Sequence, residues 1–133
     1  MIKEDFVSFE VAKLLKEKGF DEECRQYWSE SDGRFIHSES VYPIRNITNP
    51  CFFGPAAPTL QMAAKWLREE HNLSIDNTCS INGFYCSVVH IVKDKGGRII
   101  DVEDSADWET PYCKTFEEAF DKALKFCLER MLD

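Results

Sequence analysis

Three segments of the chain repeat apolar residues at helical spacing, and each follows a residue with a side-chain hydroxyl. Ser8, Thr59 and Thr115 hold the position where a hydroxyl accepts a hydrogen bond from a free backbone N–H of the first helical turn. Glu118 follows Thr115 in the chain at the spacing of a capping box. The pattern therefore predicts three helices, each beginning directly after its hydroxyl residue.

The first of these helices is expected to end at Lys18. Gly19 suits the left-handed position that follows many helices, and Phe20 can fold back onto the last turn. The apolar residues of this helix form one stripe. They are Val11, Ala12, Leu14 and Leu15.

The second and third helices carry wider apolar faces. At about 100° per residue, their apolar positions cover roughly 200° of each helix. Packing on one sheet needs about half of that width, so each helix is predicted to bury a second surface on a neighbouring helix or a partner. The positions are Leu60, Met62, Ala63, Ala64, Trp66 and Leu67 in the second helix, and Phe116, Ala119, Phe120, Ala123, Leu124, Phe126, Cys127, Leu128 and Met131 in the third.

Short β-prone segments separated by turn residues fill the rest of the chain. Residues 25–29 and 34–37 flank Ser31-Asp32-Gly33, which predicts a hairpin. The segment 84–93 has apolar residues on both faces, which is typical of a central strand. The strands beside it are expected to end at Ile81 and to cover residues 98–102.

Asn82-Gly83 is the strongest hairpin signal in the chain, because a type I′ turn needs a positive φ at both central positions. Counting back from this turn places Cys79 opposite Cys86, close enough for a disulfide. In the reducing cytoplasm expected for this chain, both should stay free thiols.

Together these elements predict an α+β fold with three helices packed on an antiparallel sheet of four to six strands. The order is helix–hairpin–loop–helix–three strands–helix. A chain of 133 residues is the size of one domain, and residues 1–133 are expected to form one.

The charge balance is acidic along the whole chain. Lys and Arg number 16 against 24 Asp and Glu, for a net charge of −8. Residues 59–131 follow the α-β-β-β-α order of double-stranded-RNA-binding domains, but residues 59–133 hold 9 basic and 14 acidic residues. Because phosphate would be repelled, no nucleic acid is expected as a partner.

The distribution of charge also argues against a membrane. The first residues are charged where a signal peptide is apolar. The longest uncharged segment, residues 46–64, contains Pro50, Pro55 and Pro58, which is unlike a membrane span. The chain is therefore expected to be cytoplasmic.

Two sets of residues contain possible metal ligands, and neither has a favourable pattern. His71, Cys79, Cys86 and His90 are residue types that zinc accepts, but Cys86 and His90 lie about 13 Å apart along one strand. The run 101–109 alternates oxygens like a calcium loop, but it lacks the Gly and the bidentate Glu of an EF-hand. No metal or cofactor is expected.

Cys51, in the segment 49–54, is the most plausible nucleophile. A catalytic thiol needs a nearby His or a helix N-terminus, and no His falls in a recognisable local signature. The segment can equally be a proline-bounded loop that tucks Phe52 and Phe53 into the core. No catalytic residue is therefore assigned.

Five carboxylates fall within the nine residues 101–109. The simplest interpretation is a solvated loop. The alternative is a partner-binding loop, because a Trp among carboxylates can anchor a basic protein surface. Its candidate residues are Asp101, Glu103, Asp104, Asp107, Trp108 and Glu109.

Three stretches resemble a family of small uncharacterised proteins carried by phages and other mobile elements of Bacteroides-type gut bacteria. They are DFVSFEVAKLLKEKGFD (5–21), APTLQMAAKWLRE (57–69), and TFEEA (115–119) continued by ALKFCLE (123–129). They cover about a third of the chain. The resemblance implies a mobile-element origin and a cytoplasmic setting, with no assigned activity and no catalytic residue to carry over.

The sequence therefore favours a non-catalytic accessory protein of a phage or mobile element that acts by protein–protein interaction. Its partner is another protein or a second copy, and a homodimer through a wide helix face would fit. Two alternatives stay open. One is a small cysteine-dependent enzyme centred on Cys51, and the other is an acidic nucleic-acid mimic that inhibits a host DNA-binding enzyme.

Overall fold

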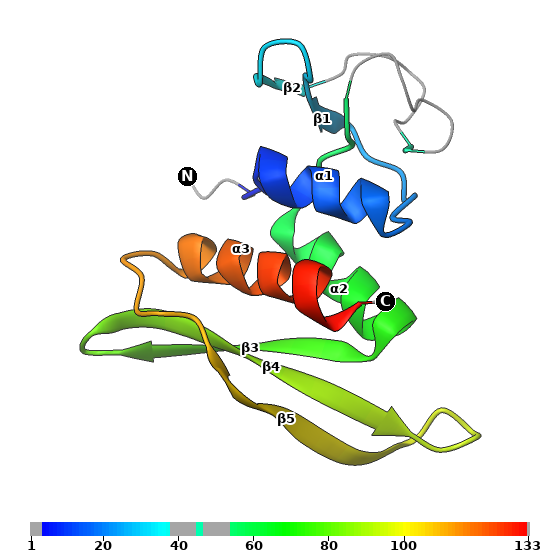
Figure 1. The fold of residues 1–133 in the computed structure, drawn as a ribbon, viewed down its shortest axis with the longest axis vertical. Helices are drawn as coiled ribbons and strands as arrows, with labels where there is room; N and C mark the ends of the chain where they lie inside the picture. Colours follow the sequence, from blue (N-terminus) through cyan, green and yellow to red (C-terminus); the bar gives the residue numbers. More distant parts are fainter. Residues whose placement is uncertain (1–3, 38–44, 47–53, 133) are drawn as a thin grey trace. The chain divides into compact units, whose positions relative to one another are not determined.

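The computed structural model describes residues 4–37, 45–46 and 54–132, and for residues 104–109 it describes the backbone alone. Contacts within the chain gather in two compact units, Met1–Met62 and Ala63–Asp133, and each is described by itself. The α+β class and the predicted order of elements are confirmed (Figure 1). The single domain over residues 1–133 stays a prediction. The elements are α1 (Phe9–Glu17), β1 (Gln26–Trp28), β2 (Phe35–His37), α2 (Leu60–His71), β3 (Leu73–Ser80), β4 (Gly83–Lys93), β5 (Ile99–Glu109), α3 (Phe116–Phe126) and the π-helical turn η1 (Cys127–Met131).

Helix α1 begins and ends as its sequence predicts. Ser8 Oγ accepts a backbone N–H of the first turn at 3.2 Å. Gly19 takes a φ of 93° after the last turn, and its N–H donates to the Lys16 carbonyl at 3.2 Å. The Phe20 N–H donates to the Leu15 carbonyl at 2.9 Å. These two bonds form a Schellman motif that folds the fully buried Phe20 back onto the helix.

The hairpin of β1 and β2 belongs to the first unit. Its second edge pairs with a later extended segment, because Trp28 donates its N–H to the Pro55 carbonyl at 3.1 Å and Ala57 donates to the Gln26 carbonyl at 2.8 Å. Both edges of β1 are therefore paired, and β1 and β2 form a sheet of their own. The structure thus has antiparallel sheets of two and three strands where one sheet of four to six was expected.

A buried asparagine in the same unit was not predicted. Asn46 donates from Nδ2 to the Phe20 carbonyl at 2.8 Å, and its Oδ1 accepts the Ala56 N–H at 3.0 Å. The side chain is almost fully buried. It therefore joins the end of α1 to the extended segment and satisfies two backbone groups that would otherwise lose a hydrogen bond.

The second unit contains the larger sheet, with β4 in the centre as its apolar pattern predicts. Figure 1 shows α3 lying along one face of this sheet. Thr115 Oγ1 caps α3 by accepting the Glu118 N–H at 3.2 Å, as predicted. The helix then continues as η1 to Met131, where the predicted helix ends.

The turn between β3 and β4 differs from the prediction. Ser80 lies opposite Gly83, so the turn residues are Ile81 and Asn82. Gly83 alone of the predicted pair takes a positive φ, 126°, so the type I′ turn is not formed. A Cβ at Gly83 would lie 2.5 Å from the Cys113 carbonyl oxygen. The glycine therefore permits a close approach of two backbone segments, which a local turn pattern does not reveal.

This shift changes the cysteine pairing. Cys79 lies opposite Phe84, and Cys86 lies opposite Asn77. The predicted juxtaposition of Cys79 and Cys86 is wrong. It was counted from a turn at Asn82-Gly83, and the observed turn, Ile81-Asn82, lies one residue earlier in the chain. Both residues are free thiols.

Helices α2 and α3 bury most of their wide apolar faces. On α2 only Met62 is clearly exposed among the predicted positions, at 38%. On α3 and η1 the positions outside the core, Phe116, Phe126 and Met131, are half-buried. A partner on one of these helix faces stays a prediction. The buried residues are Leu60, Ala63, Ala64, Trp66, Leu67, Ala119, Phe120, Ala123, Leu124, Cys127 and Leu128.

Candidate functional site

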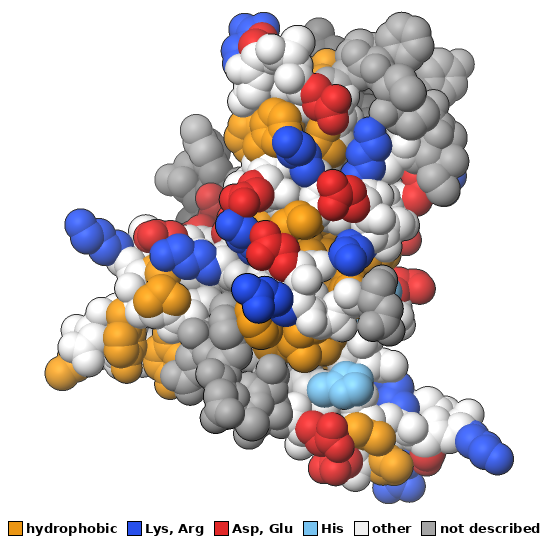
Figure 2. Space-filling view, in the orientation of Figure 1, with side chains coloured by type: hydrophobic (Ala, Val, Ile, Leu, Met, Phe, Trp, Pro, Cys, Tyr) orange, Lys and Arg blue, Asp and Glu red, His pale blue; other side chains and the backbone are white. Residues whose placement is uncertain are grey.

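An exposed apolar segment lies on β5 directly after the β4–β5 turn. Residues 99–103, called the β5 segment below, are all exposed. Ile99, Ile100 and Val102 are 56%, 62% and 55% exposed. Figure 2 shows apolar, acidic and basic side chains side by side at the end of the second unit that carries this turn. Large contiguous apolar patches are uncommon on monomeric proteins and often mark interaction sites, so these neighbouring aliphatic side chains make the segment a candidate.

The turn before the β5 segment is closed by one carboxylate. Asp94 Oδ1 accepts the N–H groups of Gly96 and Arg98, each at 2.9 Å. The Asp94 N–H donates to the Arg98 carbonyl at 2.9 Å. These bonds hold the ends of β4 and β5 together. They also place the cations of Lys93, Lys95 and Arg98, all exposed, at the tip of the hairpin.

The register of β4 and β5 is regular over residues 101–103, which have two different faces, and shifts between Asp101 and Ile99, where Ile100 is an extra residue. Glu103 lies opposite His90, and Asp101 lies opposite Val92. Because side chains alternate along a strand, both carboxylates project from one face, and Val102 projects from the other. His90 Nδ1 lies 4.0 Å from Glu103 Oε2, with both side chains at least half exposed, so this contact contributes little stability.

All six predicted partner-binding residues lie on β5, and two of them have described side chains. Asp101 and Glu103 are exposed. The expected solvated loop is wrong, because the backbone pairs Asp104 with Val89 and Glu109 with Ser87, with an irregularity between these pairs. Main-chain pairing is compatible with exposed carboxylates, so an acidic composition alone did not exclude a strand. The side chains of Asp104, Asp107, Trp108 and Glu109 lie outside the described residues.

The aliphatic residues of this site were missed as functional residues. Residues 98–102 were predicted as a strand with no role of their own. The available signal was the adjacent Ile99 and Ile100 between a glycine turn and an acidic run. Exposure could not be read from that pattern, because two adjacent isoleucines also occur in buried strands.

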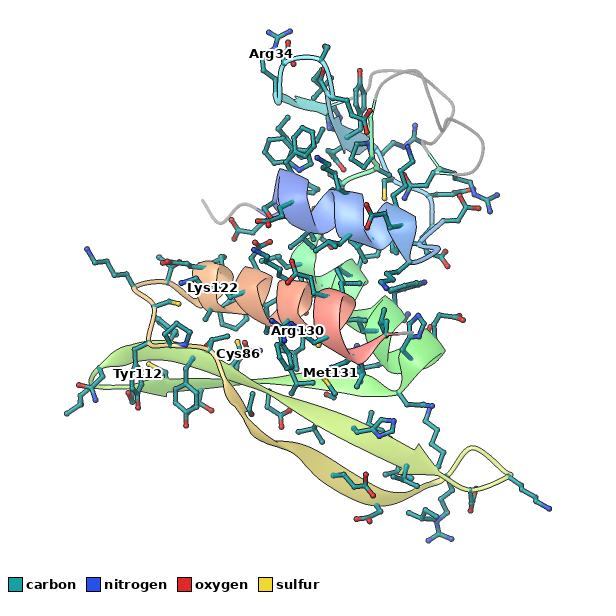
Figure 3. All side chains as sticks on the ribbon, in the orientation of Figure 1. Arg34, Cys86, Tyr112, Lys122, Arg130 and Met131 are labelled. Carbon is teal, nitrogen blue, oxygen red and sulfur yellow. The ribbon has the colours of Figure 1, made fainter. Side chains whose placement is uncertain are left out.

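Three of the described buried thiols are poor nucleophiles. Burial is the main cause that raises the pKa of Cys24 and Cys127 to about 12 and that of Cys86 to about 11. The thiolate is the reactive form, so these thiols stay protonated and unreactive near neutral pH. Figure 3 shows Cys86 on the α3 side of the sheet, and its Sγ donates to Asn77 Oδ1 at 2.8 Å. Cys51, the candidate nucleophile, lies outside the described residues.

The four possible zinc ligands have separate surroundings. The His71 ring packs edge-on against Trp66, with centroids 4.8 Å apart. Cys86 bonds to a neighbouring side chain, His90 lies beside a carboxylate, and Cys79 is exposed. Within residues 4–37, 45–46 and 54–132, no three His, Cys, Asp or Glu side chains converge as a possible metal site.

The described helices are all too short or too polar to span a membrane. Comparison of the chain with protein-family models, curated proteins and solved structures found no match. The functional argument therefore rests on the geometry of the β5 segment.

Proposed function

We propose that this protein is a non-catalytic interaction protein that binds a basic segment of a partner protein on its β5 segment. One observation carries the proposal. Three large aliphatic side chains are exposed there beside the exposed carboxylates of Asp101 and Glu103. Apolar contact supplies affinity at protein interfaces, and complementary charge selects and orients the partner. A segment that interleaves Lys or Arg with apolar residues matches both features.

The residues beyond the β5 segment support the same partner chemistry. The strand continues through Asp104, Asp107 and Glu109, so a basic segment aligned with β5 runs along a series of acidic positions. The cations at the β4–β5 turn lie at one end only. Because these cations repel other cations, the basic residues of the partner are expected to lie along the acidic positions of β5 and away from the turn.

The resemblance to proteins of phages and mobile elements supplies the setting of this proposal. An accessory protein in that setting acts on proteins of the host or of the element itself. Proteins that bind nucleic acid carry basic segments of the required kind. The proposal involves no catalytic step.

The experiment titrates the full chain with a short peptide of alternating Lys and Val, and measures affinity by calorimetry. We expect binding that weakens as salt is added, and no binding of the matching Glu-Val peptide. The double variant Ile100→Ser, Val102→Ser is expected to lose at least about tenfold in affinity, since it removes two exposed apolar contacts.

A matched control is Ile81→Ser, whose side chain is fully exposed in the β3–β4 turn, at 102%. This variant should bind the Lys-Val peptide like the natural chain. Absence of Lys-Val binding, or an equal loss in the Ile81 variant, contradicts the proposal.

A further inference from the structure

Within the part of the chain that the structure describes, the outer side of the β5 segment is an open strand edge. β5 lies at the margin of the three-stranded sheet. Ile91 of β4 directs its N–H toward the β3 side, where it donates to the Asn72 carbonyl at 2.7 Å. Its neighbour Val92 therefore directs its backbone groups toward Asp101, its partner on β5. Because the backbone N–H and carbonyl groups of successive strand residues point to opposite sides, those of Asp101 point toward β4. Those of Val102 point to the open side.

A side chain covers this open N–H. Asp101 Oδ1 accepts the Val102 N–H at 2.8 Å. Open strand edges pair readily with other chains, and charged side chains at an edge prevent indiscriminate pairing. The carboxylate that covers the edge is also one of the charges that attract a basic partner. A partner that binds the carboxylate can therefore uncover the edge at the same step.

We propose that the basic partner segment adds to the sheet as a fourth strand along the β5 segment. A carbonyl of the partner accepts the Val102 N–H, and a Lys or Arg of the partner binds the Asp101 carboxylate that is released. A neutral strand supplies the carbonyl but leaves the carboxylate without a new partner, so the exchange favours basic strands. This inference rests on the proposed function and adds the mode of binding to it.

The other open edge of the sheet lacks this selectivity. β3 has Asp76 as its sole charged residue, so it attracts a basic strand less than β5 does. A second copy of the chain is also a poor occupant of β5. Pairing of two β5 segments near Val102 brings the carboxylates of Asp101 and Glu103 from both copies together, which is unfavourable.

The test compares proline variants at the two edges of the sheet, in the full chain. Val102→Pro removes the open N–H of β5. Cys79→Pro is the matched control, because alternation along β3 directs the Cys79 N–H to the open edge of that strand. Proline is tolerated at both positions because no neighbouring strand accepts either N–H. At Val102 it also removes the bond to the exposed Asp101 carboxylate, which water can replace. Affinity for the Lys-Val peptide is expected to fall at least about tenfold in the Val102 variant and to change less than about twofold in the control.

Asp101→Asn tests the charge separately. Its amide oxygen can still accept the Val102 N–H, but the ion pair with the partner is lost. We expect about fivefold weaker peptide binding and a smaller salt dependence. Binding unchanged in affinity and in salt dependence overturns the exchange at Asp101.

A modified peptide gives a readout that does not depend on how the variants fold. Methylation of every backbone N–H keeps the charges and side chains of the Lys-Val peptide but prevents pairing as a strand. Its affinity should be at least about tenfold lower. Equal affinity of both peptides overturns strand addition, and leaves the proposed function standing if the Ile100, Val102 double variant still loses binding. Failure of the unmodified peptide to bind overturns both.

Discussion

The central strand β4 runs from a covered end to an exposed end, and the two ends make different contributions. At the covered end, which here means residues 83–88, Cys86 and Val88 are 0% and 1% exposed on the face that α3 covers, and the first three residues are half-buried (Figure 1). At the other end, Ile99 and Ile100 of the neighbouring β5 are 56% and 62% exposed. Full burial of such a side chain stabilises the fold by about 1.5–3 kcal/mol. The covered end therefore maintains the fold, and the exposed end is available for binding.

Two glycines give the largest expected contrast between these ends. Gly83, near the covered end, has a φ of 126°, and a Cβ there would lie 2.5 Å from the Cys113 carbonyl oxygen. Gly97, in the turn at the exposed end, has a φ of 82° and open space around it. We expect Gly83→Ala to lower the free energy of unfolding by about 2–4 kcal/mol and Gly97→Ala by about 1 kcal/mol. Urea unfolding measures both, and equal losses contradict the comparison.

Removing a hydrogen-bond acceptor is expected to give a smaller difference in stability loss between the two ends than the two glycine variants do. Thr110 is 4% exposed, and its Oγ1 accepts the Cys86 N–H at 2.8 Å. Thr110→Val leaves that N–H without a partner and is expected to cost about 1–3 kcal/mol. Asp94→Ala also removes an acceptor, but water replaces it in the exposed turn, so a loss of about 0.5–1 kcal/mol is expected. Thermal unfolding of the two variants tests the order, and a larger loss at Asp94 reverses it.

Alkaline pH should destabilise the folded chain through its buried thiols. Cys127 has a folded pKa of about 12, raised chiefly by burial from 9.0. Above about pH 9 the unfolded chain releases this proton and the folded chain keeps it, so stability falls as pH rises. The slope is at most about 1.4 kcal/mol per pH unit for one thiol. Urea unfolding under reducing conditions measures it.

The Cys127→Ala variant, whose baseline stability is lower, should show a shallower decline with pH. The variant Ile100→Ser at the exposed end should keep the slope of the natural chain. A free energy of unfolding that stays constant above pH 9.0, the unshifted thiol pKa, contradicts this account.

The smallest effect on stability is expected at the β5 segment itself. Ile100 is 62% exposed, so Ile100→Ser should change the free energy of unfolding by less than about 0.5 kcal/mol. The same variant should weaken Lys-Val peptide binding several-fold. A stability loss comparable with that of Thr110→Val would show that this residue belongs to the core.

Local sequence patterns predicted much of the fold. The capping hydroxyls of Ser8 and Thr115, and Gly19 after α1, act within one turn of helix, so their roles could be read directly. The order of elements and the central position of β4 followed from periodicity in the same way.

Features that depend on distant backbone contacts could not be predicted. Gly83 permits a close approach to Cys113 and does not lie in the turn itself. The turn and the cysteine register therefore differ from those predicted from the local sequence. Asn46 joins Phe20 to Ala56 across a long separation in sequence. Of the candidate site, the sequence indicated the carboxylates of Asp101 and Glu103. It did not reveal that the neighbouring isoleucines are exposed, because exposure depends on what the rest of the fold covers.

The most direct test of the central claim is amide hydrogen exchange across the full chain, measured by NMR with and without the Lys-Val peptide. Binding on the β5 segment predicts that new protection concentrates at residues 99–103 and is largest at the Val102 N–H. Amides at the covered end, such as those of Cys86 and Val88, should keep the same exchange rates. Peptide binding whose protection centres on α3 or on the first unit, with residues 99–103 unchanged, contradicts the account.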